Sequence, residues 1–529
     1  MHAPVTHWDA ETDLCVVGFG AAGASAALEA TDAGADVLAL DRFGGGGATA
    51  LSGGVVYAGG GTAQQRAAGA TDTPDAMYAY LKAETQGVVS DALLRRFCAD
   101  SAANLAWLEE KGAVFEGTLC PFKTSYPTDD YLLYHSGNEQ FPPYRDAAPP
   151  APRGHRTKAK GLASGKVLFG HLAAAARARG VTLVPRARAR RLILDGDRVV
   201  GVEYARLTGA AARAHRALSA PLGKGGNYYP QGLGPLVRAV RRLEARAATF
   251  TVRARRGVVL AAGGFAFNPR MLSEHAPQYL PGRPLGTIGD DGSGIRLGTS
   301  AGGATAYLDR VSAWRFFSPP TSLGRGLLVD RAGRRICNEM LYGAAIGDHM
   351  VNRHDGHAYL VVDQAIWERA KKELRTQTVF FQKAQMGYLF ALGHRKAATP
   401  EAAAARAGIS PDGLARTLEA YNAAAREGRP DPLGKPAEYV QPLAGGPYYV
   451  LDCSLGSSLF YPCPMITLGG LQVHDDSGQV KRPDGSVIDG LYAAGRSAVG
   501  VCSHSYVSGL SIADAVFSGR RAGAHAAAR

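Results

Sequence analysis

The chain lacks several features that would mark a membrane, redox or metal protein. Its 529 residues contain no apolar run of about 18 residues, so no membrane span is predicted. The seven cysteines lie far apart, with no CxxC pair and no CxxCH motif, and we expect buried, reduced thiols. The histidines lack metal-ligand spacing, so we expect no metal site. No apolar signal core precedes the first motif, and we expect a cytoplasmic protein.

Positive charge is in excess, with a formal net charge of +13. Because alanine, arginine and glycine are abundant throughout, a general composition bias accounts for most of this charge, and we expect no nucleic-acid partner. Arginines concentrate in residues 234–257, where apolar residues alternate with them. A helix at 234–246 would place Leu236, Val240 and Leu243 on one side and arginines on the other. Residues 217–247 are therefore either a peripheral membrane contact or a solvated surface excursion.

A motif near the start of the chain predicts a dinucleotide-binding turn. The apolar run 13–17 is followed by a glycine cluster, an alanine-rich stretch at 21–33 and a second apolar run at 36–40 that ends in Asp41. This pattern predicts one β-α-β unit. The glycine cluster matches GxGxxG, with Gly18, Gly20, Ala22 and Gly23.

Each motif residue has a physical reason to be where it is. Gly18 would make the tight turn, Gly20 would let a pyrophosphate approach the backbone, and Gly23 would let the helix pack on the strand. The free N–H groups at the helix start attract phosphate. Asp41 follows Gly23 by 18 residues and can accept hydrogen bonds from a ribose.

Glycine-rich segments elsewhere predict further walls of the same site. Residues 43–61 contain too much glycine for a helix or strand interior, and we expect a loop that wraps a ligand, with a flexible linker as the alternative. Residues 255–268 and 488–500 each read as a strand that ends in small residues. The residues expected at these walls are Ala48, Thr49, Ser52, Gly53, Gly54, Ala262, Gly263, Gly495 and Arg496.

The remaining pattern predicts two domains. Strand patterns dominate both ends of the chain, whereas residues 271–442 alternate helices with short strands. We predict a nucleotide-binding domain made of residues 1–280 and 443–529, with a catalytic or substrate domain at 281–442 inserted into it. The other predicted elements are helices at 73–86, 90–112 and 165–179, a strand at 181–185, a hairpin within 190–205, two strands within 249–265 and a last helix from about Ser511.

The whole set of motifs resembles the FAD-dependent family of soluble fumarate reductase and succinate dehydrogenase flavoproteins. It comprises GxGxxG with its acid, "GGATALSGG", "VVLAAGGF", "TIGDDGSGIRLG", "GRRICNE" and "GLYAAGR". The resemblance implies an α/β fold: a Rossmann-like FAD-binding domain of the glutathione-reductase type with an inserted α+β domain. It adds Arg42, Ala189, Asp291, Ser511 and Ile512 to the expected cofactor residues. Succinate dehydrogenases attach flavin to a histidine in the glycine-rich loop, which this loop lacks, so non-covalent FAD is expected.

Reactive residues point to one branch of that family. Fumarate reductases carry an arginine proton donor shortly after the "NE" pair, whereas Asn338-Glu339 is followed here by Met-Leu and Tyr342. A tyrosine there is similar to the 3-ketosteroid dehydrogenases. "SYVSGLS" does not match the "TYxGPG" of the Δ1 enzymes but resembles the Tyr-x-Ser-Gly of the Δ4-(5α) enzymes, which also carry "GRRAG". "LLYHSGNE" (132–139) and "PAPRGHR" (150–156) look like the same subgroup.

The resemblance implies a role for each reactive residue. Tyr342 would be the base, and the Tyr506 phenol and Gly509 N–H would hold a carbonyl. Ser508 would pass the proton outward, while the helix start at Ser511 would face the flavin. Alternatives remain: Tyr342 as a core phenol, and Ser508 as a helix cap. Three tyrosines are candidates for a substrate entrance, namely Tyr126, Tyr131 and Tyr134, and His504 is a candidate substrate contact.

The expected reaction is formation of a C=C bond next to a ketone, with the 4,5 bond of a 3-ketosteroid preferred. The expected partners are a 3-ketosteroid or a similar ketone and an unidentified electron acceptor. One alternative is a 3-ketosteroid Δ1-dehydrogenase, and another is a flavin enone or enoate reductase. An alternative of a different class is a non-catalytic FAD-binding protein.

Overall fold

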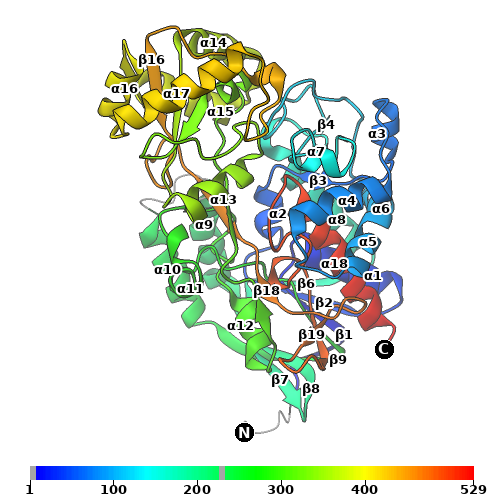
Figure 1. Ribbon diagram of the computed structural model, residues 1–529. Coiled ribbons are helices and arrows are strands. Elements are labelled where there is room, and N and C mark those ends of the chain that lie inside the picture. The colour runs from blue at the N-terminus through cyan, green and yellow to red at the C-terminus, as the bar shows by residue number, and fades with distance from the viewer. Residues whose placement is uncertain (1–6, 225–232) are drawn as a thin grey trace.

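A largely parallel β-sheet, the central sheet of its domain, lies in the lower part of Figure 1 and takes its strands from both ends of the chain. The computed structural model describes residues 7–224 and 233–529. Strands β20, β9, β1, β2 and β6 run parallel in this order, β19 flanks β20, and the β7–β8 hairpin pairs with β9. The strands are β1 (Ala10–Val17), β2 (Val37–Asp41), β6 (Thr182–Pro185), β7 (Ala187–Asp195), β8 (Arg198–Arg206), β9 (Ala248–Leu260), β19 (Gln479–Lys481) and β20 (Val487–Ala493). The predicted Rossmann-like α/β fold is confirmed.

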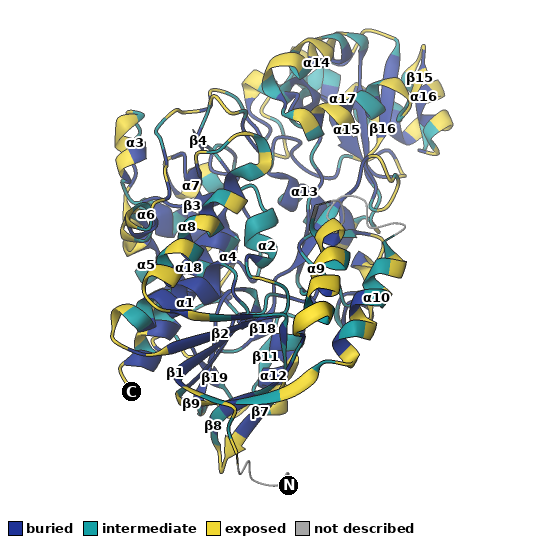
Figure 2. Ribbon diagram, turned by 180° about the vertical axis from the view of Figure 1, so that it is seen from behind, coloured by how far each residue is buried: buried dark blue, intermediate teal, exposed yellow. Residues whose placement is uncertain are grey.

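Helices cover this sheet, whose inner strands are buried on both faces (Figure 2). Such burial explains why β1, β2 and the end of β9 read as continuous apolar runs. The helices of this domain are α1 (Ala21–Asp32), α2 (Gly47–Leu51), α3 (Ala63–Ala67), α4 (Pro74–Thr85), α5 (Asp91–Ala99), α6 (Ser101–Glu110), α7 (Tyr144–Ala147), α8 (Ser164–Ala178), α9 (Gly209–Lys224), α10 (Gly234–Ala245) and α18 (Leu510–Ala527). A small sheet beside them contains β3 (Val55–Tyr57), β4 (Leu133–Tyr134) and β5 (Gly154–Arg156).

The first and last helices pack against each other through glycines. A Cβ atom added at Gly519 would lie 2.3 Å from the carbonyl oxygen of Ala22, and one added at Gly523 would lie 2.2 Å from that of Ala26. Backbone atoms of α1 therefore fill the space that a side chain on α18 would need. This contact brings the segment before α18 to the same edge of the sheet as the glycine turn before α1.

A second hydrophobic core extends from Phe265 to Met465. Its four-stranded antiparallel sheet has the order β13-β14-β16-β15, and α14 to α17 lie around it at the top of Figure 1. The helices are α11 (Pro269–His275), α12 (Ser293–Ser300), α13 (Gly343–Arg353), α14 (Gln364–Gln377), α15 (Phe380–Ala391), α16 (Pro400–Ala407) and α17 (Pro411–Arg426). The strands are β10 (Arg283–Pro284), β11 (Thr305–Ala306), β12 (Val311–Ala313), β13 (Leu327–Val329), β14 (Tyr359–Val362), β15 (His394–Ala397), β16 (Tyr448–Asp452), β17 (Pro464–Thr467) and β18 (Gly470–Leu471). The division at residues 280 and 442 stays a prediction.

Three expected elements differ from the structure. The region 249–265 contains one long strand, β9, and not two; Gly257, at φ +130°, sits inside it where β20 approaches closely. The helix expected at 90–112 is divided at Asp100 into α5 and α6. The glycine-rich segment 43–61 contains a one-turn helix, α2, and a strand, β3, although we expected a loop.

The state of the cysteines and the length and polarity of the helices match what the sequence led us to expect. All seven cysteines are free and buried, as expected from their spacing. Within residues 7–224 and 233–529, the helices are too short or too polar to span a bilayer.

The glycine contact between α1 and α18 gives a stability prediction. Gly523→Ala should destabilise the protein by about 1–3 kcal/mol, because the added methyl group must push two packed backbones apart. Gly387→Ala on α15 is the matched control, since a Cβ atom there would meet nothing within 4 Å. Urea unfolding of both variants measures the difference; equal stability of the two would contradict the close-packing argument.

Candidate active site

A cavity of about 510 Å³ lies at the carboxyl edge of the central sheet. Its wall begins at the glycine turn after β1, passes the ends of β9 and β20, and reaches Tyr342 and Tyr506. All the predicted cofactor and catalytic residues line it except Gly23 and Asp291. Chain segments that are far apart in sequence therefore meet at one cavity, as expected for the carboxyl edge of a parallel sheet.

The three motif glycines are required for different reasons. A Cβ atom at Gly18 would lie 2.5 Å from the carbonyl oxygen of Ala261, and one at Gly23 would lie 1.9 Å from that of Gly18. Both glycines therefore serve the packing of the turn. A Cβ atom at Gly20 would lie 3.5 Å from Thr49 Oγ1, an ordinary contact. The protein itself has room for a side chain at Gly20, which fits the expectation that a ligand must approach there.

Asp41 organises the turn as well as lining the cavity. Its two carboxylate oxygens accept hydrogen bonds from the backbone N–H groups of Phe19 (3.1 Å), Phe43 (2.8 Å) and Gly45 (2.9 Å). The carboxylate thus joins the glycine turn to the chain after β2. Each oxygen has more than one lone pair, so this use does not prevent Asp41 from accepting a further hydrogen bond from a ribose.

The cavity wall fits a pyrophosphate. The N-cap residue of α1 is Gly20, which has no side chain to cap the helix, and among the described residues its first turn carries no acid. Arg496 lines the cavity and pairs with Asp290, and its buried Nη1 has no partner among the described residues. The partial positive charge at a helix start and a buried guanidinium nitrogen both favour an anion. These residues could hold the phosphates of a dinucleotide.

The glycine-rich segment contributes a wall through α2. Thr49 Oγ1 accepts a hydrogen bond from the Ala21 N–H at 3.1 Å, which connects α2 to the start of α1. A Cβ atom at Gly53 would meet the Tyr126 ring at 2.5 Å, and one at Gly54 would meet the backbone of Ser164 at 2.3 Å. These two glycines are needed for packing inside the protein, so the segment is an ordered wall and not a flexible linker.

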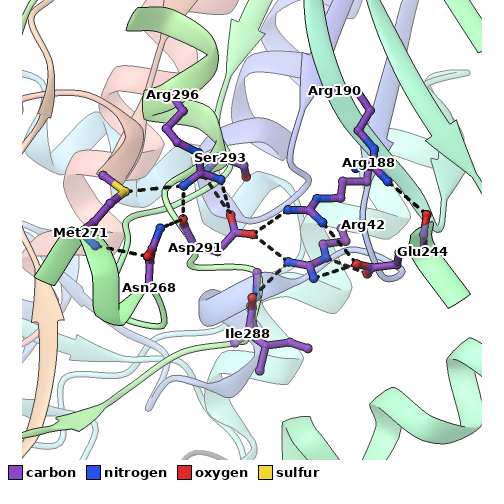
Figure 3. A network of polar contacts seen from close by, with 12 residues as sticks. Arg42, Arg188, Arg190, Glu244, Asn268, Met271, Ile288, Asp291, Ser293 and Arg296 are labelled. Carbon is purple, nitrogen blue, oxygen red and sulfur yellow. Dashed lines mark hydrogen bonds and ion pairs between the residues drawn. The ribbon is translucent and has the colours of Figure 1, made fainter. Parts of the chain in front are cut away.

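An ionic network lies beside the dinucleotide end of the cavity (Figure 3). Arg42 binds both oxygens of Glu244 at 2.8 and 2.9 Å and Asp291 at 3.1 Å. Arg188 lies 3.1 Å from Asp291 and 3.5 Å from Glu244. Asp291, which we expected to contact the cofactor, therefore pairs with the two arginines and lies outside the cavity lining. The neighbouring Asp290 lines the cavity.

Burial alone would raise the pKa of Glu244. Hydrogen bonds from His215 and Arg42, together with the positive charges of Arg42 and Arg188, instead lower this pKa to about 2. Glu244 is therefore ionised at neutral pH. The two arginines and the two carboxylates balance each other, which makes their burial favourable only while all four are present.

The basic segment 217–247 faces this network, although part of it, 225–232, lies outside the described residues. Helix α9 adds Ser219, Ala220, Leu222 and Gly223 to the cavity wall. In α10, Val240 is buried and Leu236 and Leu243 are half-buried, so the apolar side that one of the two alternatives would place on a membrane packs against the protein. Only the arginine-rich side is exposed (Figure 2). The membrane contact remains untested.

Aromatic residues form the opposite end of the cavity. The ring centroids of Tyr342 and Tyr506 are 6.5 Å apart, Trp314 stacks on Tyr506 at 5.0 Å, and Phe316 meets Tyr342 at 5.3 Å. The Gly509 N–H points at the Tyr506 hydroxyl at 3.4 Å. The two groups expected to hold a carbonyl therefore lie at one place on the wall.

Ser508 connects two tyrosines. The Tyr134 hydroxyl donates to Ser508 Oγ at 2.9 Å. Helix α18 begins at Leu510 with Gly509 as its N-cap, and within the described part of the chain no side chain caps it, so Ser508 does not have the capping role that one alternative gave it. Gly509 has φ +91°, and a Cβ atom there would lie 2.6 Å from the Tyr57 nitrogen. Only glycine fits this position without strain.

Burial raises the pKa of both tyrosines at this end of the cavity. The pKa of Tyr342 is raised well above its usual value, although its interaction with Ser508 lowers it in part. The pKa of Tyr506 is also raised by burial, with smaller opposing effects from Ser511 and Gly509. Both phenols therefore carry their protons at neutral pH. Tyr506 is then a hydrogen-bond donor, and Tyr342 can accept a proton only while it passes its own onward.

Several residues lie where the sequence did not lead us to expect them. Of the three entrance candidates, Tyr126 lines the cavity and its hydroxyl bonds to the Gly53 carbonyl at 3.1 Å, whereas Tyr131 lies outside the lining and Tyr134 is fully buried behind Ser508. His504 is half-buried and outside the cavity lining. Trp314 and Phe316 were missed; the aromatic run "WRFF" at 314–317 was the available signal.

The parallel sheet, the glycine turn and the anion-binding wall define a dinucleotide-binding protein of the flavoprotein type. A family model described as FAD binding domain matches residues 13–511, and the chain belongs to this family. The expected resemblance and the expected FAD cofactor are thereby confirmed.

Individual relatives span nearly the whole chain. A 3-oxo-5-alpha-steroid 4-dehydrogenase from Comamonas testosteroni is 40% identical over 514 residues, covering 93% of this chain and 94% of the relative. The structure of a 3-ketosteroid-Δ4-(5α)-dehydrogenase from Rhodococcus jostii RHA1, in complex with 4-androstene-3,17-dione, is 33% identical with a TM-score of 0.84, covering 99% of this chain and 98% of that one. A 3-ketosteroid Δ1-dehydrogenase from Sterolibacterium denitrificans, 20% identical with a TM-score of 0.69 and covering 98% and 99% of the two chains, shares the fold.

The network around Glu244 gives a prediction about FAD retention. Glu244→Lys places a third cation beside Arg42 and Arg188, so α10 should separate from the network and α9 should cover the cavity less well. We expect FAD release to accelerate about tenfold or more, since breaking a buried ion pair is costly. The recovery of flavin fluorescence after dilution measures the release rate.

Arg238→Glu, on the exposed side of α10, is the matched charge-reversal control and should retain FAD as the wild type does. Equal release rates in all three proteins would show that this segment does not help to retain the cofactor.

Proposed function

We propose that this chain is an FAD-dependent 3-ketosteroid dehydrogenase that introduces the 4,5 double bond of a 5α-3-ketosteroid. The observation that carries the proposal is the meeting of Tyr342, Tyr506, Ser508 and the Gly509 N–H at one end of the cofactor cavity. The full-length similarity to two proteins named as Δ4-(5α) enzymes supports the same assignment.

The charge distribution of the wall favours a neutral ketone. Among the described lining residues, the arginines are Arg42, Arg188 and Arg496. The first two belong to the network of Figure 3, and Arg496 pairs with Asp290 beside Gly263. Arg315, close to Tyr342 in the chain, bonds instead to the carbonyl oxygens of Tyr461 and Ser454 at 3.2 and 3.0 Å. A dicarboxylate would need cations at the tyrosine end, whereas a ketone needs the hydrogen-bond donors that are present.

The reaction removes a proton from C4, next to the ketone, and a hydride from C5. FAD, when bound, supplies the hydride acceptor. The Tyr506 hydroxyl and the Gly509 N–H donate to the C3 oxygen, which gains negative charge as the C4 proton leaves. Holding this oxygen makes the C4 hydrogen more acidic, so a weak base suffices.

Tyr342 takes the C4 proton. Because the buried phenol is itself protonated, its own proton must move to Ser508 as the new one arrives, and Ser508 must give up its proton in turn. The Tyr134 hydroxyl, which donates to Ser508 Oγ at 2.9 Å, holds Ser508 in place for this step, and the released proton leaves through the cavity that Ser508 lines. The electron acceptor that reoxidises the flavin is unidentified.

We also propose that FAD is held without a covalent bond. None of the described lining residues is histidine or cysteine. After acid precipitation of the purified protein, the yellow chromophore should therefore remain in the supernatant; flavin that stays with the pellet would contradict this.

The catalytic roles are tested by tyrosine replacement. We expect 5α-androstane-3,17-dione to bleach the oxidised flavin band of the wild type under anaerobic conditions. Tyr342→Phe and Tyr506→Phe should each slow this step about 10²- to 10⁴-fold, since each removes one hydroxyl group from the transition state. Stopped-flow absorbance measures the rate.

Tyr359→Phe, a tyrosine of β14 outside the cavity lining, is the matched control and should react as the wild type does. If both replacements reduce flavin at the wild-type rate, the assigned roles are wrong. If the wild-type flavin is unchanged by this ketosteroid, while an enone reoxidises the reduced protein, an enone reductase is the better description.

A further inference from the structure

A buried carboxylate outside the cavity connects the two segments that carry the catalytic tyrosines. Glu84, in the last turn of α4, is 3% exposed and does not line the cavity. The chemistry proposed above does not use it. It belongs to a layer of buried polar residues that includes the motif "LLYHSGNE", whose role the sequence left open.

One side of Glu84 leads to Tyr342. Glu84 Oε1 accepts hydrogen bonds from the Asn138 side-chain NH₂ group at 2.7 Å and from the Tyr80 hydroxyl at 2.7 Å. Asn138 Oδ1 in turn accepts the backbone N–H of Tyr342 at 2.6 Å. The Asn138 backbone N–H also donates to the Tyr80 hydroxyl at 3.0 Å. Asn138 is therefore fixed at three points and fixes the start of α13, where Tyr342 lies.

The other side of Glu84 leads to Tyr506. The Ser505 hydroxyl lies 2.9 Å from Glu84 Oε2 and 3.0 Å from the Glu84 carbonyl oxygen, and Ser505 directly precedes Tyr506. Two residues after Tyr506, the Ser508 N–H donates to the Ser136 carbonyl at 3.1 Å. Segments 134–139 and 504–509 are thus held side by side.

Close packing leaves little freedom in this arrangement. A Cβ atom at Gly137 would lie 2.4 Å from the Tyr80 hydroxyl and 2.8 Å from Val507. Asn138 is 1% exposed and Tyr80 is 1% exposed. Water cannot easily replace a lost partner here, so removing Glu84 would leave buried donors unpaired.

We propose that Glu84 is a positioning residue that fixes the distance between Tyr342 and Tyr506 from behind the cavity. Its two carboxylate oxygens hold one tyrosine segment each. The inference rests on the proposed function, because that function gives the tyrosine spacing its importance: the base and the carbonyl donor must reach adjacent carbons of one rigid substrate.

The hydrogen-bond partners of Glu84 predict which replacement of this residue should keep both tyrosine segments in place. A glutamine can keep an oxygen toward Asn138 and Tyr80 and turn its NH₂ group toward Ser505, whose hydroxyl can then accept while still donating to the carbonyl of residue 84. An alanine loses both connections. A positioning role therefore predicts rescue by Glu84→Gln, whereas a role as a proton carrier does not.

The experiment compares flavin reduction in single anaerobic turnovers. Glu84→Ala should slow reduction by 5α-androstane-3,17-dione by about 10- to 100-fold, the range expected when reacting groups are misplaced. Glu84→Gln should stay near the wild-type rate. Leu81→Ala is the matched control, because it also removes a buried α4 side chain, 0% exposed, but leaves both connections in place. It should lower Tm without slowing the reaction at temperatures where it is folded.

A second pair of measurements keeps the test valid if Glu84→Ala folds poorly. Ser505→Ala removes only the Tyr506 side and should also slow flavin reduction, with little change in steroid Kd. Hydrogen exchange by mass spectrometry should show faster exchange in peptides covering 341–347 for Glu84→Ala and 504–509 for Ser505→Ala.

The outcomes separate the inference from the proposed function. Wild-type rates in Glu84→Ala or in Ser505→Ala, or a Glu84→Gln variant as slow as Glu84→Ala, would overturn the positioning role. If no 3-ketosteroid reduces the wild-type flavin, the proposed function fails. In that case, unchanged hydrogen exchange in the variants would separately show that Glu84 does not hold the two tyrosine segments.

Discussion

The packing of α18 on α1 is the contact on which the rest of the site depends. These helices come from opposite ends of the chain, and their backbones approach because Gly519 and Gly523 carry no side chain. The same sheet edge thereby receives the glycine turn after β1 and the segment 504–511 before α18. With α18 in place, the cofactor-binding turn and the groups expected to contact a ketone share one cavity.

The cavity separates two kinds of chemistry along its length. Charged side chains gather at the dinucleotide end, where the arginines are balanced by Asp290, Asp291 and Glu244. Aromatic rings and hydroxyl groups form the other end, where burial keeps the phenols of Tyr342 and Tyr506 protonated. An anionic cofactor and an apolar ketone can therefore bind side by side, each in the surroundings that favour it.

Much of this organisation could be predicted from the sequence, because local patterns encode it. The strand-glycine-helix-strand pattern predicted β1, the turn and α1, and the small residues after β9 and β20 predicted further walls. The single strand β9 was predicted as two strands because Gly257 looks like an interruption. In the structure, Gly257 lets the backbone of β20 pack closely against β9.

The contacts that cross the fold could not be predicted. Asp291 was expected at the cofactor, but it faces Arg42 and Arg188, because pairing between distant charges depends on tertiary geometry. Likewise, nothing in the α4 sequence signals that Glu84 lies behind both tyrosine segments. The capping role considered for Ser508 was equally compatible with the sequence, and only the start of α18 at Leu510 excludes it.

The position of the new double bond distinguishes 4,5 from 1,2 dehydrogenation. The anaerobically bound 5α-androstane-3,17-dione, once it has reduced the flavin, can be extracted and identified by mass spectrometry and NMR. We expect 4-androstene-3,17-dione, because the C3 oxygen is held by Tyr506 and Gly509 while Tyr342 reaches C4. A product with its double bond between C1 and C2, or no oxidised steroid at all, would contradict this expectation.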